Sequence, residues 1–134
     1  MCLIGDLNAR ISEEQALDSE LLIDLSYICN TRSARDKTLN TEGKKLLELI
    51  EDMGGIVLNG RTMVDSYGDF SFLSGRGNSV IDYCICSQSF LCFVDDFSVL
   101  SKPLSDHMPL NLNLKFAFNN SNANGMCRRL RWKN

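Results

Sequence analysis

The chain has 134 residues, of which 44% are hydrophobic and 23% are charged, a composition that is ordinary for one globular domain. No stretch approaches the roughly 20 consecutive apolar residues of a membrane-spanning helix, and the start of the chain lacks the basic region and long apolar run of a secretory signal. The formal net charge of -3 argues against a protein that coats nucleic acid by charge alone, but it leaves open an enzyme whose carboxylates hold a cation.

The first half of the chain predicts a strand, an irregular excursion and a helix that leads into a second strand. An apolar strand at residues 1–5 ends at a Gly-Asp turn, and the mixed, polar residues 9–37 predict a loop with short helical pieces. Helix 42–53 follows a cap at Asn40 or Thr41, repeats apolar residues at helical spacing and stops at two glycines. A strand at residues 56–59 comes next. This order is typical of an α/β layer fold, with the helix on the outer face of the sheet.

The second half of the chain changes to the two-residue period of strands. Strands are predicted at residues 69–73 and 79–86, joined by a tight turn, and then at residues 96–101 and 108–116. Residues 119–125 are rich in Asn and predict a linker, which leads into a basic tail. We therefore expect one domain over residues 1–118 and a linker with a tail over residues 119–134.

The six cysteines do not form a recognisable disulfide or zinc pattern. Cys84 and Cys86 alternate in the predicted strand 79–86, which places both on one face as small hydrophobic residues. No Cys-x-x-Cys pair occurs and the chain has one histidine, so a zinc site is poorly supported. Reduced thiols in an intracellular protein, nuclear or cytoplasmic, are the favoured interpretation.

Asp6 and Asn8 form the first motif that can carry chemistry, in the sequence Gly-Asp-Leu-Asn-Ala. Residues two apart can reach one ligand at the end of a strand, where α/β sheets place their sites. Asp supplies a hard oxygen to Mg²⁺ or accepts a proton from water, and Asn coordinates through its carbonyl or donates to a phosphate oxygen. Gly-Asp-x-Asn also makes ordinary turns, so the motif alone does not decide between the two interpretations.

Asp82 and His107 are the other two candidates. Asp82 interrupts an apolar strand, where a buried carboxylate needs a cation, a metal or several donors, although a wet edge strand would also accept it. His107 follows Ser105-Asp106, and imidazole acts as a base near pH 7 when a carboxylate fixes its tautomer. Adjacent side chains in a strand point apart, so we expect the partner of His107 to be Asp82 rather than Asp106. A surface or structural histidine is the alternative.

The order of these motifs resembles one known group of hydrolases. Gly-Asp-Leu-Asn, then Ile-Asp-Tyr within a strand, then Ser-Asp-His before the last strand is similar to the endonuclease/exonuclease/phosphatase superfamily, and most like its non-LTR (LINE-type) retrotransposon endonucleases. The matching segments are Gly5 to Arg10, Asn40 to Leu47, Leu58 to Arg61, Phe70 to Phe72, Ser79 to Tyr83, Ser105 to Leu110 and Arg131 to Lys133. The resemblance implies the C-terminal half of the four-layered α/β sandwich of deoxyribonuclease-like proteins, a mixed and largely antiparallel sheet with a flanking helix.

The resemblance also implies catalytic roles for four residues. Asp6 would orient and deprotonate the attacking water. Asn8 would bind the scissile phosphate or stabilise the transition state. Asp82 would hold His107, which would contact the phosphate.

Metal and substrate residues follow from the same resemblance. Asp106 would join Asp6 and Asn8 in holding Mg²⁺ (or Mn²⁺). Ser71 stands where relatives often carry Thr near the site, and Phe72 stands where an aromatic ring lines the DNA pocket. Both are therefore candidate substrate-binding residues.

The implied activity is metal-dependent hydrolysis of DNA, in a parent protein that also carries a reverse transcriptase domain. The upstream half of the family, with its metal-binding Glu, has no counterpart in this sequence, which begins at Met1. We therefore expect this chain to be a weak or inactive nuclease, with an apolar sheet surface that invites pairing with another chain. The alternatives are a non-catalytic retroelement fragment with no selected activity and a phosphatase of the same fold.

Overall fold

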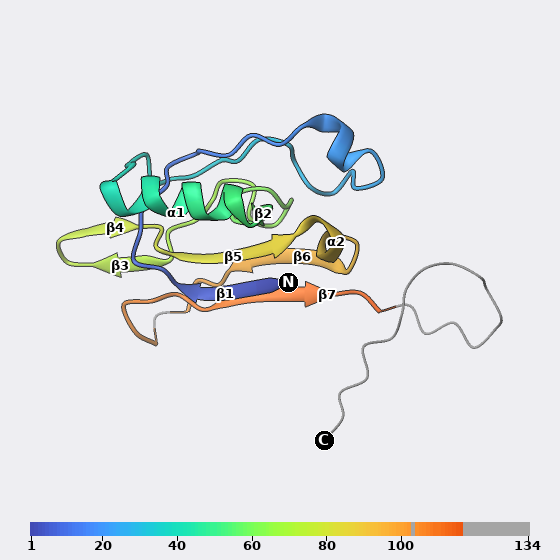
Figure 1. The fold of residues 1–134 in the computed structure, drawn as a ribbon. Helices are drawn as coiled ribbons and strands as arrows, with labels where there is room; N and C mark the ends of the chain where they lie inside the picture. Colours follow the sequence, from blue (N-terminus) through green and yellow to red (C-terminus); the bar gives the residue numbers. More distant parts are fainter. Residues whose placement is uncertain (103, 117–134) are drawn as a thin grey trace, which may run out of the picture.

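This computed structural model describes residues 1–102 and 104–116, whose main elements are two small antiparallel sheets, one hairpin and one long helix. The first sheet has the strand order β1-β5-β2, and the second pairs β6 with β7. Figure 1 shows α1 on one side of β5, with β6 and β7 on the other. The strands are β1 (Cys2–Asp6), β2 (Gly55–Val57), β3 (Phe72–Ser74), β4 (Gly77–Ser79), β5 (Asp82–Ser87), β6 (Val94–Val99) and β7 (Leu110–Leu114).

Strand β5 is the centre of the fold because both of its faces are buried. Tyr83 and Ile85 belong to the cluster that also contains Ile50 of α1. Cys84 and Cys86 belong to the opposite cluster, which contains Phe97 of β6. The alternation of side chains along the strand thus separates two cores, one against the helix and one against the second sheet. Both cysteines are completely buried, as the prediction of small hydrophobic residues on one face required.

The helix α1 (Thr41–Asp52) agrees with the predicted helix 42–53 to within one residue at each end. Asn40 caps it, since the Asn40 side-chain oxygen accepts hydrogen bonds from the backbone N–H of Gly43 at 2.7 Å and of Arg10 at 3.0 Å. Gly54 then adopts the left-handed conformation, with φ of 61°, that ends many helices. The helix packs on the β1-β5-β2 sheet, which confirms its expected place.

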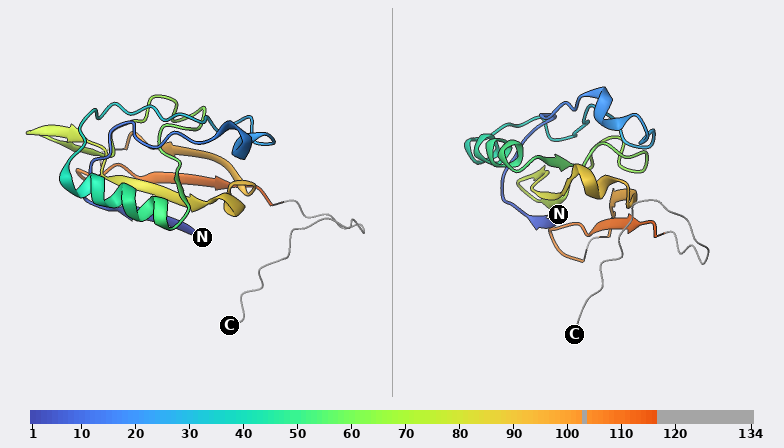
Figure 2. Two further views of the ribbon diagram at one scale, coloured as in Figure 1. Left: turned by 45° about the horizontal axis from the view of Figure 1, so that its top comes forward. Right: turned by 45° about the vertical axis from the view of Figure 1, so that its right-hand side comes forward.

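The excursion between β1 and α1 is irregular apart from the short 3-10 helix η1 (Ser19–Leu22), as predicted. The side chain of Arg61 fixes it to the sheet. This guanidinium is completely buried and donates to the backbone carbonyls of Val57, Cys29 and Asn30, and to Gln15. Burial lowers the pKa of Arg61 to about 10. The views in Figure 2 show the excursion lying along one side of the molecule.

The prediction of one continuous strand over residues 79–86 is wrong, because this segment divides into β4 and β5. The backbone N–H of Val80 donates to Asp36 Oδ2 at 3.0 Å. The N–H groups of Ile81 and Asp82 donate to Ser71 Oγ at 3.0 and 2.9 Å. Side chains thus replace a neighbouring strand as the acceptors for these N–H groups, and the strand is interrupted at residues 80 and 81.

Other boundaries differ by smaller amounts. The predicted strand 69–73 starts only at Phe72, and the short helix α2 (Gln88–Leu91) was not predicted. The remaining predicted strands occur as β1, β2, β6 and β7, each shifted or shortened by up to two residues at an end. The predicted linker and basic tail over residues 119–134 lie outside the described residues. Within the described residues, no helix combines the length and the apolarity needed to cross a lipid bilayer.

Candidate active site

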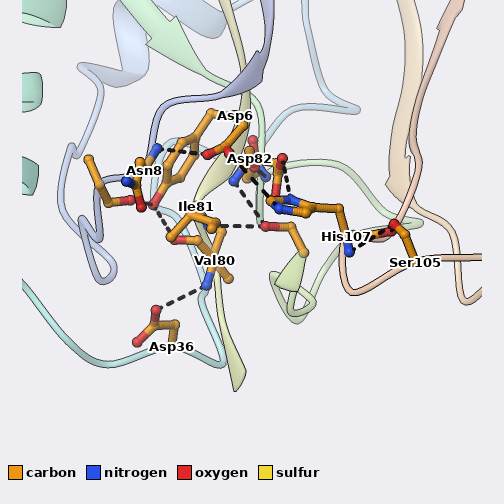
Figure 3. A network of polar contacts seen from close by, with 12 residues as sticks. Asp6, Asn8, Asp36, Val80, Ile81, Asp82, Ser105 and His107 are labelled. Carbon is orange, nitrogen blue, oxygen red and sulfur yellow. Dashed lines mark hydrogen bonds and ion pairs between the residues drawn. The ribbon is translucent and has the colours of Figure 1, made fainter. Parts of the chain in front are cut away.

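Asp6, Asp82 and His107 meet where β1 ends and β5 begins. Asp6 and Asp82 are register partners in the antiparallel pair β1–β5, so their Cα atoms lie opposite one another. His107 comes from the segment before β7, which forms a single β-bridge with Phe72. Figure 3 shows the three side chains pointing toward one another. One carboxylate oxygen from each aspartate and one imidazole nitrogen all lie within 4.8 Å of one another.

The imidazole of His107 is hydrogen-bonded to Asp82. His107 Nδ1 lies 3.1 Å from both Asp82 Oδ1 and Asp82 Oδ2, which confirms the predicted contact. His107 Nε2 lies 4.0 Å from Asp6 Oδ2. A carboxylate accepts the Nδ1 proton, so the neutral ring holds its lone pair on Nε2, the nitrogen that faces Asp6 and solvent.

The charges around His107 favour its protonated form. The hydrogen bond with Asp82 raises the pKa of His107 above its ordinary value, and the negative charges of Asp82, Asp6 and Asp106 act in the same direction. The His107 side chain is 41% exposed, so solvent weakens these effects without removing them. The imidazole therefore has the environment of a base whose basicity is increased by a carboxylate.

Asp82 is buried, and side chains form hydrogen bonds with both its backbone N–H and its backbone carbonyl. Its N–H donates to Ser71 Oγ at 2.9 Å, and its carbonyl accepts from Asn59 Nδ2 at 3.0 Å. Asn59 Oδ1 also accepts from the N–H of Cys84 at 3.0 Å. The Asn59 side chain thus continues the pairing with β5 beyond the end of β2. The sequence alone indicated no role for Asn59, although its motif Leu-Asn-Gly-Arg was among the segments that carried the resemblance to the endonucleases.

Asn8 and Asp106 lie at the border of this group. The backbone of Asn8 is left-handed, with φ of 48°, and its N–H donates to Asp6 Oδ1 at 2.8 Å. The turn after β1 thus orients the Asp6 carboxylate. Asp106 is exposed and its backbone carbonyl accepts from Leu73 at 2.8 Å. It is not among the three residues that could share one ion in the described part of the chain.

Ser71 and Phe72, the two candidate substrate residues, differ in their surroundings. The Phe72 ring packs edge-on against His107, with 5.0 Å between the ring centroids. This contact restricts the orientation of the imidazole. Ser71 is completely buried, and its hydroxyl oxygen faces the backbone of Ile81 and Asp82.

The donor set of the site suits a divalent cation. Asp6 and Asp82 carry two negative charges, and His107 carries at most one positive charge. The site is therefore negative and would repel a phosphodiester unless a cation is present. Mg²⁺ is commonly held by one or two carboxylates and the phosphates of its substrate, and Mn²⁺ or Zn²⁺ also accept imidazole. Asp6 fits such an ion best, because its carboxylate is about half exposed and lies farther from the imidazole than the carboxylate of Asp82 does.

The fold resembles that of a solved endonuclease. The likeness covers 85% of this chain and is to the endonuclease domain of TRAS1, a telomere-specific non-LTR retrotransposon, with a TM-score of 0.55 and 20% sequence identity. It confirms the expected deoxyribonuclease-like α/β fold. This chain spans 41% of the length of that structure. No family model matches the sequence, and no curated protein matches it.

Proposed function

We propose that this chain carries part of the active site of a metal-dependent phosphodiesterase that acts on DNA. One observation carries the proposal: the Asp82–His107 pair, with His107 Nε2 turned toward Asp6. A buried carboxylate that fixes the tautomer of an imidazole, beside a second and exposed carboxylate, is an arrangement for proton transfer at a phosphate. The likeness of the fold to an endonuclease domain supports the choice of DNA as substrate.

Each residue then has a definite task. Asp6 orients and deprotonates the attacking water, and the Asn8 amide donates to the scissile phosphate. In its protonated form His107 donates from Nε2 to the phosphate, because Asp82 accepts the Nδ1 proton. A bound Mg²⁺ or Mn²⁺ would offset the negative charge of the phosphate and the carboxylates. Asp6 would hold this ion, with Asn8 and the exposed Asp106 as further oxygen ligands.

We further propose that the chain by itself cleaves DNA slowly. It spans 41% of the length of the endonuclease structure that it resembles, and Asp6, Asn8 and Asp106 would give Mg²⁺ only a few of the oxygen ligands that its nearly octahedral coordination requires. A loss of one group that stabilises the transition state costs about 10²–10³ in rate in other enzymes. The same observation supports the alternative of a non-catalytic fragment. A reverse transcriptase domain in the same open reading frame stays a prediction from the resemblance.

A plasmid-nicking assay at high protein concentration tests the proposal. We expect slow conversion of supercoiled DNA to the open-circular form, dependent on Mg²⁺ or Mn²⁺ and stopped by a chelator. Asp82→Asn and His107→Ala should each lower the rate by about 10²-fold or more, because they remove the imidazole that contacts the phosphate or the carboxylate that orients it. Asp95→Asn, an exposed aspartate of β6 outside the site, is the matched control and should nick at the unchanged rate.

Two outcomes would contradict the proposal. One is nicking that His107→Ala and Asp82→Asn leave intact. The other is a complete lack of metal-dependent nicking at the highest protein concentration, which would favour the non-catalytic alternative.

A further inference from the structure

We propose that Ser71 is a positioning residue that holds Asp82 and His107 in register through the main chain, without touching the substrate. The sequence placed Ser71 among the substrate-binding candidates. The inference concerns the proposed site, but its main test does not depend on DNA cleavage.

The Ser71 hydroxyl is directed into the protein. Ser71 is completely buried, and its Oγ accepts the N–H groups of Ile81 and Asp82 at 3.0 and 2.9 Å. These two peptide groups lie at the junction between β4 and β5. By binding the Asp82 N–H, the hydroxyl oxygen fixes the backbone of Asp82, and the backbone in turn places the Asp82 side chain.

The backbone of Ser71 fixes the other member of the pair. Its carbonyl accepts from the N–H of Met108 at 2.7 Å, and its own N–H donates to the carbonyl of Ser79 at 3.1 Å. Met108 directly follows His107, and Phe72, which directly follows Ser71, packs against the imidazole. One residue thus binds the chain next to both halves of the Asp82–His107 pair, which are 25 positions apart in sequence.

Strand β2 ends before it reaches Asp82, so side chains must bind the backbone of Asp82 in place of a strand. Asp6 and Asp82 face each other across β1–β5, and β2 pairs with β5 only as far as Val57 and Ile85. The polar groups of the Asp82 backbone would therefore lack a strand partner on that side. Instead, Ser71 Oγ accepts a hydrogen bond from the Asp82 N–H, and Asn59 Nδ2 donates one to the Asp82 carbonyl. Loss of either leaves a buried polar group without a partner.

Nuclear magnetic resonance of the imidazole tests this role, because His107 is the only histidine in the sequence. At a pH where the ring is neutral, the ¹⁵N shifts should show the proton on Nδ1, where Asp82 accepts it. In Ser71→Ala we expect the ring to lose this preference and to adopt the Nε2–H form that predominates in free histidine. Ser71→Thr keeps the hydroxyl and should retain the wild-type tautomer. If the chain nicks DNA, Ser71→Ala should lower kcat by about 10- to 100-fold with little change in KM.

Thr62→Val is the matched control, because it also removes a buried hydroxyl, one that donates to the carbonyl of Phe97 at 2.6 Å. It should leave the tautomer unchanged. If Ser71→Ala does not fold, Ser71→Cys, with nearly the same volume and a weaker acceptor, replaces it and should lose the Nδ1–H form. An unchanged tautomer in a folded Ser71→Ala or Ser71→Cys protein, or an equal change in Thr62→Val, would overturn the inference. Absence of nicking together with the expected tautomers would count against the proposed function only.

Discussion

At the scale of single residues, the notable feature is a histidine whose protonation is coupled to a buried carboxylate. The hydrogen bond to Asp82 raises the pKa of His107 in the folded state. A group whose pKa is raised by folding stabilises the fold when it is protonated. This stabilisation is complete below the ordinary histidine pKa of about 6.5 and disappears as the pH rises through the folded value.

The coupling predicts a pH-dependent effect of Asp82→Asn on stability. The difference in the free energy of unfolding between the wild-type protein and this variant should be larger near about pH 6 than near about pH 9. The pH-dependent part should stay below about 1 kcal/mol, because the imidazole is 41% exposed. Urea denaturation at the two pH values measures it. Asp95→Asn should show no such change between the two pH values, and a pH-independent effect of Asp82→Asn would refute the coupling.

At the scale of elements, the N-terminal end of α1 connects the helix with the turn that carries Asp6 and Asn8. Asn40 Oδ1 accepts one N–H from the first turn of the helix and another from Arg10. Arg10 in turn forms a two-pronged ion pair with the buried Asp36, which also accepts from the N–H groups of Val80 and Thr38. Burial opposes the charge of Asp36, but the hydrogen bonds from Arg10, Val80 and Thr38 outweigh it and lower its pKa. The cap of α1 is thus connected, through Arg10 and Asp36, to the backbone of Val80, two residues before Asp82.

Asn40→Ala should therefore destabilise the protein by about 1–2 kcal/mol, the upper part of the range for a helix cap. The physical reason is that two N–H groups lose the same acceptor. Thermal or urea denaturation measures the loss. Asp18→Ala is the control, because Asp18 caps only the short helix η1 through an exposed contact of 3.3 Å. Equal losses for the two variants would show that the second bond of Asn40 contributes nothing.

At the scale of the whole molecule, β1 leaves apolar surface exposed at the edge of a sheet. It pairs with β5 on one side, and within the described residues no strand pairs with its other edge. Leu3 and Ile4 of β1 are nearly half exposed. An apolar edge strand without a charge or a proline in its middle is a template for pairing with another chain.

We expect the isolated protein to self-associate as its concentration rises, and Ile4→Lys to shift it toward the monomer. The lysine places a charge on the edge strand, where pairing with a second strand would desolvate it. Sedimentation velocity over a range of concentrations measures the change. Leu49→Lys, which replaces a slightly more exposed leucine on α1, is the control and should leave the association unchanged. A wild-type protein that stays monomeric throughout would contradict the prediction.

The local pattern of the sequence was sufficient for α1, for four of the strands and for the pairing of two site residues. Helix periodicity, an Asn cap and two glycines act within a few residues, so α1 could be located closely. The two-residue period likewise indicated β1, β2, β6 and β7. Asp82 and His107 could be paired because a carboxylate within an apolar strand and a single histidine each needed a partner.

Only the tertiary structure decided the division of strand 79–86, the inward direction of Ser71 and the roles of Asn59 and Arg61. Each of these depends on a side chain that binds backbone groups far away in sequence, as Asp36 does with Val80 and Ser71 with Asp82. The sequence pattern records which face of an element is apolar. A hydrogen bond between a side chain and a distant peptide group leaves no such periodicity, because it exists only once the packed elements bring the two groups together.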